Sequence, residues 1–535
     1  MRRAHSATAT PIAALAVLTL GVGAAAAASC ESLAGKTFGD ASIGAATAVT
    51  PPFSVMGMDP PAPVPVNAPF CRVQGTLKPS ADSDIKFEVW LPPADKWNGK
   101  YQGVGNGGFA GSLIYPGMDW ALEGGYAVSG TDTGHVGGSL DSQWALGHPE
   151  KISDFGWRGV HETAAASKAI VEAYYGKAPA HAYFSGCSDG GREALLEAQR
   201  FPKDYDGIVA GAPANSWTRL MVTAISDEQA LAAPEGWLSP EKLGLITKTA
   251  QAFCHGENGV IDDPGQCHFD PSTLLCKAGQ TNACLTASEV GTLSKIYAGS
   301  QDGAGKPILP GFPAGGEAGP AAWSLWISGA EPKRGSGSLI YIFGTGFFRD
   351  MIFDSPNWDF HGMDMGAGLV EADAKVGQTL NATDTDLSAF KAAGGKLLQY
   401  HGWADSAIPA ASSIDYYEAV AARMGGVTAI QPFYRLFMAP GMLHCGTGDG
   451  PNAIGGVFGL PSPSRDPAHD VVSALAHWVE DGAAPSQIIA TLYHDNDPAK
   501  GVAAQRPWCA YPEVAQHSGQ GSASEAASYA CVAPK

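Results

Sequence analysis

The sequence predicts an α/β fold with a doubly wound sheet, because short apolar segments of strand character alternate with segments of helical pattern. Residues 182–184 and 208–213 are apolar and fit buried strands, whereas residues 161–175 and 193–200 are rich in good helix formers. The strand pattern returns at residues 396–400 after a long interval. Chains that alternate strands and helices in this way fold into a central sheet with helices on both faces.

A candidate nucleophile follows the first of these strands. Residues 186–190, Gly-Cys-Ser-Asp-Gly, match the G-x-S-x-G pattern. Between a strand and a helix this pattern predicts a nucleophile elbow, a sharp turn that exposes the oxygen of Ser188. The helix N-terminus directs the N–H of Asp189 at an oxyanion formed beside this serine. The alternative is a glycine-rich turn without chemistry, which the flanking strand and helix disfavour.

An acid and a base come later in the chain, each in a loop after a predicted strand. Asp405 follows the strand at 396–400, and His444 follows a strand at 433–438. In the α/β-hydrolase fold the triad has the chain order serine, acid, histidine, with the last two in such loops. The sequence therefore predicts an α/β-hydrolase core with Ser188, Asp405 and His444 as the catalytic triad.

Other polar residues fit the triad less well. Asp449 is a competing acid, but it follows the histidine in the chain. Asp132 and His135 lie in a loop before the nucleophile, which is the wrong order for this fold. We interpret these two residues as hydrogen-bonding groups of the loop.

A glycine-dense loop at residues 97–111 is the candidate for the second oxyanion contact. In serine hydrolases such a loop supplies a backbone N–H group, and Gly107 and Gly108 are the candidates here. A phosphate-binding loop is disfavoured, because the G-x-x-x-x-G-K-[ST] pattern is missing. A flexible turn or a tightly packed turn is the structural alternative.

The chain divides into an export signal, a catalytic domain and an insertion. A short basic start and an apolar, alanine-rich run predict that residues 1–28 are a cleaved signal peptide. Residues 216–390 differ from their surroundings in four cysteines, many glycines and many aromatic residues, so we interpret them as an inserted lid domain. Residues 29–215 and 391–535 then form the catalytic domain. We expect a soluble mature protein, since no later apolar stretch is long enough and free of charges or glycine to span a membrane. The signal peptide indicates that this protein is secreted or periplasmic.

Charge and cysteine content narrow the partners. The formal net charge is −19, and no basic runs occur, which argues against nucleic acid or an anionic membrane and favours a neutral or weakly charged substrate. Ten cysteines form an even set in an exported chain, which predicts disulfides. Zinc is the alternative for the cysteines between residues 254 and 284, but no C-x-x-C pair occurs there.

Two of the cysteines flank the predicted triad. Cys187 directly precedes Ser188, and Cys445 directly follows His444. Proton transfer brings the serine oxygen and the histidine nitrogen within about 3 Å, so the neighbouring residues come within reach of a disulfide. The sequence therefore predicts a Cys187–Cys445 bridge that holds the base beside the nucleophile.

The Cys187-Ser188-Asp189 and His444-Cys445 motifs resemble the signature of the tannase and feruloyl esterase family, which also includes mono(2-hydroxyethyl) terephthalate hydrolase. The resemblance extends over nearly the whole mature chain. It implies an α/β-hydrolase core with a lid, activity on esters of aromatic acids and no required cofactor. It also implies the pairs Cys30–Cys71, Cys187–Cys445, Cys254–Cys267, Cys276–Cys284 and Cys509–Cys531.

The resemblance directs attention to side chains of the lid. Trp326, Phe343 and Phe347 are expected to stack on the aryl ring of a substrate. Arg349 is a candidate for binding a substrate carboxylate, and an arginine held in an ion pair or on the surface is the alternative.

A calcium loop is frequent in the lid of this family, but here residues 254–264 are shorter and lack the first aspartates. Calcium takes about six to eight oxygen ligands. Glu257, Asn258, Asp262 and Asp263 could supply some of them. A metal-free turn closed by a disulfide is the preferred interpretation.

Together these features predict a secreted serine carboxylic ester hydrolase that cleaves esters of aromatic acids through an acyl-enzyme. Feruloyl and galloyl esters are the expected substrates, with terephthalate monoesters as a further candidate. The alternatives are a secreted hydrolase of polyesters or peptides, and a non-catalytic aromatic-binding module.

Overall fold

The structure is a computed structural model that describes Met1, Ala4 and residues 28–58, 61–256, 259–319, 321–331, 337–456 and 460–534. The predicted signal peptide, residues 1–28, lies almost entirely outside the described residues. Within these ranges, no helix combines the length and the apolar character that crossing a membrane requires.

A mixed sheet of ten strands forms the centre of the molecule. Its order is β1 (Thr37–Phe38), β2 (Ala41–Val49), β5 (Phe70–Leu77), β6 (Ile85–Leu91), β8 (Ala127–Thr131), β7 (Lys100–Val104), β9 (His181–Cys187), β10 (Gly207–Gly211), β13 (Lys396–Gly402) and β14 (Tyr434–Ala439). The strands from β1 to β8 pair antiparallel, and those from β8 to β14 pair parallel. The predicted α/β fold is confirmed.

Helices cover both faces of the parallel half, because neighbouring strand residues point in opposite directions. Ile208 packs in one core with α3 (Gly159–Tyr175), α4 (Asp189–Arg200) and α13 (Ala411–Met424), whereas Val209 packs in another with α15 (Val471–Asp481). Both side chains are buried. The remaining helices of this part are α1 (Tyr115–Glu123), α2 (Pro149–Ser153) and α14 (Val427–Ile430).

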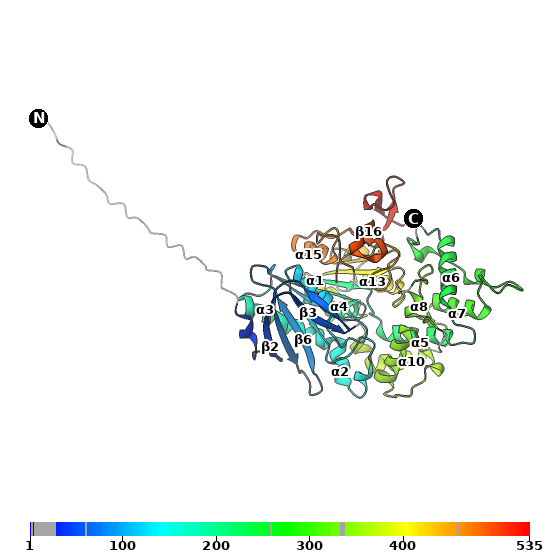
Figure 1. Ribbon diagram of the computed structural model, residues 1–535, viewed down its shortest axis with the longest axis horizontal. Helices are drawn as coiled ribbons and strands as arrows, with labels where there is room; N and C mark the ends of the chain where they lie inside the picture. Colours follow the sequence, from blue (N-terminus) through cyan, green and yellow to red (C-terminus); the bar gives the residue numbers. More distant parts are fainter. Residues whose placement is uncertain are drawn as a thin grey trace.

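The chain between β10 and β13 leaves the sheet and builds a largely helical region. It contains α5 (Trp217–Leu231), α6 (Pro240–Phe253), α7 (Ala287–Ala298), α8 (Trp323–Trp326), α9 (Leu339–Gly346), α10 (Met365–Ala372), α11 (Gln378–Leu380), α12 (Ser388–Ala392) and the strand pair β11 (Ser300–Gln301) and β12 (Pro307–Leu309). Figure 1 shows α5 to α8 and α10 grouped on the side away from β2 and β6. A separate apolar core, including Leu243, Leu293 and Trp323, holds part of this region together.

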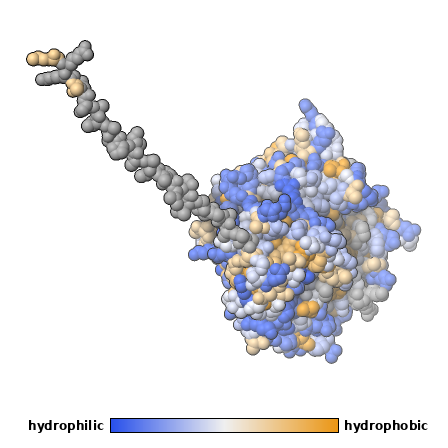
Figure 2. All heavy atoms as spheres, turned by 60° about the vertical axis from the view of Figure 1, so that its left-hand side comes forward, coloured by the Kyte–Doolittle hydropathy of each residue, from blue (hydrophilic) through white to orange (hydrophobic). Residues whose placement is uncertain are grey.

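Three strand pairs complete the structure. They are β3 (Phe53–Met58) with β4 (Pro61–Val66), β15 (Gln487–Tyr493) with β16 (Val502–Cys509), and β17 (Val514–His517) with β18 (Tyr529–Val532). The ten cysteines form five disulfides, Cys30–Cys71, Cys187–Cys445, Cys254–Cys267, Cys276–Cys284 and Cys509–Cys531, the pairing that the family resemblance implies. On the face shown in Figure 2, hydrophilic residues predominate and hydrophobic residues form small groups between them.

Candidate active site

Ser188 lies in a sharp turn between β9 and α4, with backbone angles φ 66° and ψ −120°. These angles are unfavourable for a residue with a side chain, so the surrounding structure must hold them. The N–H of Ser188 donates to the carbonyl of Gly211 at 3.0 Å, and its carbonyl accepts from Arg192 (3.1 Å) and Ala214 (3.0 Å). The turn has the geometry of a nucleophile elbow, which presents the serine hydroxyl at the carboxyl end of β9.

The two glycines of the motif allow the chain to pack closely around this turn. A Cβ atom at Gly186 would lie 2.4 Å from the carbonyl oxygen of Gly190. A Cβ atom at Gly190 would lie 2.8 Å from the carbonyl oxygen of Asn106. Both distances are shorter than atoms tolerate, so side chains at these positions would push the elbow apart.

Asp405 and His444 form a hydrogen-bonded pair in which Asp405 is buried and His444 is partly buried. His444 Nδ1 lies 2.8 Å from Asp405 Oδ2, while Asp405 Oδ1 accepts N–H bonds from Ala407 (2.8 Å) and Ile408 (2.9 Å). Burial alone would raise the pKa of Asp405, but the charge of His444 and hydrogen bonds from both His401 and His444 hold it well below its ordinary value. An ionised carboxylate only accepts, so Nδ1 carries the proton and Nε2 is free to act as a base.

Sequence reasoning missed a second imidazole on the same carboxylate. The fully buried His401 places Nε2 3.2 Å from Asp405 Oδ2 and 3.1 Å from the carbonyl of Ile408. Its Nδ1 lies 2.7 Å from Ser413 Oγ. Two acceptors around Nε2 require a proton there, so His401 donates to Asp405 and fixes its orientation. His401 is the second-to-last residue of β13 and precedes Asp405 by four positions, and this place near the carboxyl end of a buried strand was the available signal.

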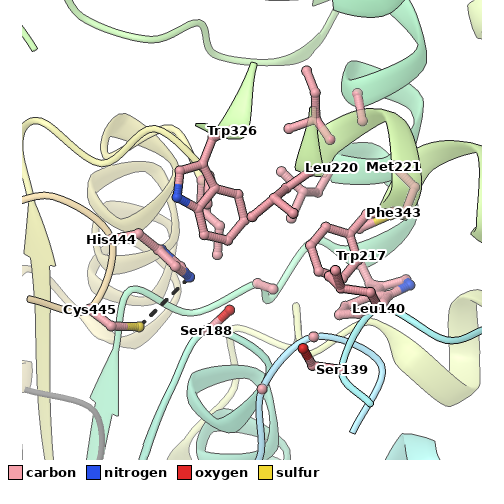
Figure 3. Close-up of a pocket in the computed structure, with 18 of the residues that line it drawn as sticks. Ser139, Leu140, Ser188, Trp217, Leu220, Met221, Trp326, Phe343, His444 and Cys445 are labelled. Carbon is pink, nitrogen blue, oxygen red and sulfur yellow. Dashed lines mark hydrogen bonds between the residues drawn. The ribbon is translucent and has the colours of Figure 1, made fainter. Parts of the chain in front are cut away.

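A disulfide joins the nucleophile and the base through their chain neighbours. Cys187 and Cys445 are 258 residues apart in sequence, yet their Cα atoms are 5.9 Å apart. Figure 3 shows the Ser188 hydroxyl and the His444 imidazole on the same side of the pocket, close to Cys445 of this bridge. Between these two described residues no hydrogen bond is formed, and His444 Nε2 lies 3.7 Å from Cys445 Sγ. Such bonds are often long before substrate binds.

Replacing Cys187 and Cys445 together by alanine should lower kcat roughly 100-fold, because a misplacement of about 1 Å in the catalytic geometry has that effect. The matched control is the Cys509→Ala/Cys531→Ala variant. Its bridge lies away from the pocket and joins two cysteines that are 22 residues apart in the sequence. Loop lengths predict that the first variant loses about 5 kcal/mol of unfolding free energy and the control about 3 kcal/mol.

Activity is to be measured at a temperature at which circular dichroism shows both variants folded. A kcat for the Cys187→Ala/Cys445→Ala variant equal to that of the control would show that the bridge only stabilises the fold.

Gly107, Gly108 and Ser188 line the same pocket, as the predicted oxyanion site requires. Gly108 has φ +57°, and a Cβ atom there would lie 2.4 Å from the carbonyl oxygen of Ser139. Asp189 is the first residue of α4, so its N–H has no acceptor within the helix. Its carboxylate accepts a hydrogen bond from Arg192 Nε at 2.6 Å inside the protein.

The pocket at Ser188 has a volume of about 430 Å³ and a mostly apolar lining. Helix α5 contributes Trp217, Leu220, Met221, Ala224 and Asp227, and the neighbouring region adds Trp326, Leu339, Ile340 and Phe343. The rings of Trp326 and Phe343 stack at 6.3 Å, and Trp326 meets the His444 ring edge-on at 4.8 Å. These aromatic residues stand over the serine in Figure 3. Trp326 and Phe343 therefore line the pocket, and their stacking on a substrate ring stays a prediction.

The predictions for Phe347 and Arg349 as pocket residues are wrong. Phe347 is fully buried and packs against Phe348 at 5.0 Å. Arg349 Nε and Nη2 bind the Asp350 carboxylate at 2.7 and 2.5 Å. The reason is a change of helical period, since α9 ends at Gly346 and residues 347–352 form a π-helical turn that points these side chains away from the Phe343 face.

Two regions of the structure bear on metal binding. Of the four candidate calcium ligands, Glu257 and Asn258 lie outside the described residues. Asp262 Oδ1 accepts a hydrogen bond from Arg506 Nη1 at 2.7 Å, and this guanidinium competes with a metal ion for the carboxylate. Burial raises the pKa of Asp263. A separate group, His161, Glu197 and Asp204, brings three potential ligand atoms within 4.8 Å of one another, outside the lining of the serine pocket.

Comparisons with known proteins identify related esterases. The sequence profile described as tannase and feruloyl esterase matches residues 71–532. An uncharacterized esterase of Xanthomonas campestris pv. campestris is 40% identical over 488 residues, which cover 86% of this chain and 84% of that protein. A probable feruloyl esterase B-1 of Aspergillus oryzae is 30% identical over 482 residues, covering 88% and 85%.

Solved structures show the same fold. The crystal structure of feruloyl esterase B from Aspergillus oryzae superposes with a TM-score of 0.85 at 29% identity, covering 94% of this chain and 99% of that chain. Tannin acyl hydrolase from Aspergillus niger shares the fold with a TM-score of 0.73 at 23% identity, covering 94% of each chain. The chain therefore belongs to the tannase and feruloyl esterase family, and it is a carboxylesterase with an α/β-hydrolase core.

Proposed function

We propose that this esterase hydrolyses esters of aromatic acids, with Ser188 as nucleophile, His444 as general base and Asp405 as the group that orients the imidazole. The observation that carries the proposal is the 2.8 Å Asp405–His444 hydrogen bond beside a strained serine turn in an apolar pocket. The chain order and the position of each residue after its strand agree with a serine hydrolase triad.

In the first step, His444 Nε2 takes the proton of Ser188 while the serine oxygen attacks the ester carbonyl carbon. The carbonyl oxygen becomes an oxyanion, held by the N–H of Asp189 and an N–H of Gly107 or Gly108. Each such donor contributes roughly 3 kcal/mol to the stability of the transition state. Collapse of the tetrahedral intermediate breaks the ester C–O bond, and the imidazolium returns its proton to the leaving alcohol.

In the second step, water attacks the acyl-enzyme. His444 takes a proton from the water, and a second tetrahedral intermediate forms in the same oxyanion site. Its collapse breaks the bond between the acyl carbon and Ser188 Oγ, the imidazolium returns its proton to that oxygen, and the acid is released. Asp405 stays ionised throughout, which its lowered pKa permits, and stabilises the imidazolium in both steps.

The lining of the pocket favours a neutral aromatic acyl group. The stacked pair Trp326 and Phe343 offers ring faces, each well-placed aromatic contact contributing about 0.5–1.5 kcal/mol. Among the described lining residues there is no lysine or arginine. Arg349 is bound to Asp350, so this pocket offers no cation to a terephthalate carboxylate. Feruloyl and related hydroxycinnamoyl esters are therefore better candidates than terephthalate monoesters, and the name of the Aspergillus oryzae relative, probable feruloyl esterase B-1, agrees with them.

We further propose that residues 216–390 act as a lid over the pocket and that the protein is exported. In support of the lid, α5, Trp326 and α9 contribute much of the pocket lining while Ser188 and His444 come from the sheet domain. Five disulfides support an oxidising compartment, the medium or the periplasm.

A panel of esters and amides tests the substrate class. Methyl cinnamates should be hydrolysed with a kcat/KM roughly 10- to 100-fold above that of methyl butyrate, because burying an aromatic ring contributes about 1.5–3 kcal/mol. Peptide amides and an aliphatic polyester should be turned over far more slowly. A preference for the aliphatic ester, the polyester or the amide would contradict the proposal.

A further inference from the structure

One face of helix α5 runs along the pocket from the catalytic end to the remote end. Ala214, just before α5, donates its N–H to the carbonyl of Ser188 at 3.0 Å, so the helix starts beside the nucleophile. Six residues of α5 line the pocket, and all of them except Thr223 recur every three or four positions, which keeps those five on one face. The last of them, Asp227, lies roughly three turns beyond Trp217. Asp227 is therefore at the far end of this face.

Asp227 is a buried acid without a partner in the protein. Its side chain lines the pocket although the residue is 2% exposed. Within the described parts of the chain, no group forms a hydrogen bond or an ion pair with it. The next residue differs, since Glu228 accepts a hydrogen bond from Ser338, which caps the N-terminus of α9. Glu228 thus supports the fold, whereas Asp227 faces the pocket with its hydrogen-bonding capacity unused.

The chemical state of Asp227 follows from its surroundings. Burial, together with the nearby charge of Glu228, raises the pKa of Asp227 well above its ordinary value. A neutral carboxyl group has one O–H donor and a carbonyl acceptor. A phenolic hydroxyl has the complementary pair, one donor and one acceptor. Such a ligand would satisfy Asp227 without bringing a charge into an apolar pocket, which a carboxylate or an ammonium group would do.

We propose that Asp227 is a specificity-determining residue that binds a hydroxyl group carried by the aromatic ring of the acyl part of the substrate, at the end remote from the scissile ester. The proposal rests on the proposed function, because it assumes that the ring of an aryl ester packs against the Trp326 and Phe343 pair. It narrows the substrate class to hydroxylated aromatic acids. A hydroxyl group on the alcohol part would use the same chemistry and is distinguished by the test.

The test compares methyl 4-hydroxycinnamate, methyl 4-methoxycinnamate and methyl cinnamate with the native enzyme and with the variants Asp227→Leu and Asp227→Asn. The native enzyme should favour the 4-hydroxy ester over the unsubstituted ester by roughly 10- to 100-fold in kcat/KM. The methoxy ester, which only accepts, should fall between them. Asp227→Leu should reduce the preference to about unity while methyl cinnamate is still hydrolysed, and Asp227→Asn, which keeps a donor and an acceptor, should retain most of it.

Glu228→Gln is the matched control. It changes the adjacent acid and removes only the smaller cause of the raised pKa of Asp227, so burial still keeps Asp227 neutral and the ratio between the esters should be unchanged. Thermal unfolding of each variant checks that the fold is kept. A native enzyme without preference for the hydroxylated ester, or an Asp227→Leu variant with the native ratio, would overturn the proposal.

Two further outcomes show whether the position of the hydroxyl group or the proposed function itself is wrong. A preference that appears only for 2-hydroxyethyl over ethyl esters of cinnamate overturns the assignment of the hydroxyl to the acyl ring. Hydrolysis of methyl butyrate with no turnover of any cinnamate overturns the proposed function itself, whereas turnover of all cinnamates at one rate overturns only the role of Asp227.

Discussion

Replacing Ser188 with alanine should abolish ester hydrolysis, with kcat falling on the order of 10⁶-fold, because no other group can form the acyl-enzyme. The fold should persist, since alanine keeps the Cβ atom and the backbone bonds of the turn to Gly211, Arg192 and Ala214. Methyl cinnamate hydrolysis and thermal unfolding measure the two quantities separately.

Ser167→Ala is the matched control for this variant. Ser167 is a fully buried serine of α3 and does not line the pocket, so its replacement should leave kcat within about twofold of the native value. Turnover by Ser188→Ala at a rate comparable to this control would rule out Ser188 as the nucleophile.

The Asp405→Asn variant should lower kcat on the order of 10⁴-fold, since an amide in this place favours the wrong tautomer of the histidine. The asparagine oxygen can still accept from Ala407 and Ile408, which turns its NH₂ group toward His444 Nδ1. The imidazole then carries its proton on Nε2 and cannot accept one from Ser188. The donor of His401 also meets this NH₂ group, so some loss of stability is expected as well.

Asp449→Asn provides the comparison for this prediction, because Asp449 is the competing acid of the sequence. The structure places Asp449 in the lining of a different pocket, away from Ser188. Its replacement should leave kcat close to the native value. Loss of activity in Asp449→Asn with activity kept in Asp405→Asn would reverse the assignment of the triad acid.

The elements that hold the site follow from local sequence patterns. The predicted strand at 182–184 lies inside β9, the strand at 396–400 lies inside β13, and the helix at 161–175 lies inside α3. Their patterns are strong because these segments are buried on one or both faces. Helix α4 begins at Asp189, four residues before the predicted start, since the glycines of the elbow enter the helix directly.

The composition of the pocket was only partly predictable. Trp326 and Phe343 line the pocket, but Phe347 does not, because the direction of a side chain after Gly346 depends on a π-helical turn that no local pattern announces. Asp227 continues an otherwise apolar helix face. Asp227 is buried because α5 packs against α9, which lies more than one hundred residues later in the chain. A local sequence pattern cannot predict a contact between two such distant segments.

Covalent labelling tests the central claim most directly. The native enzyme should react with a fluorophosphonate to give one adduct, on the peptide that contains Ser188, in parallel with loss of esterase activity. The Ser188→Ala variant should remain unlabelled. An adduct on another residue that accompanies the loss of activity, or full inactivation with Ser188 unmodified, would contradict a serine nucleophile at this elbow.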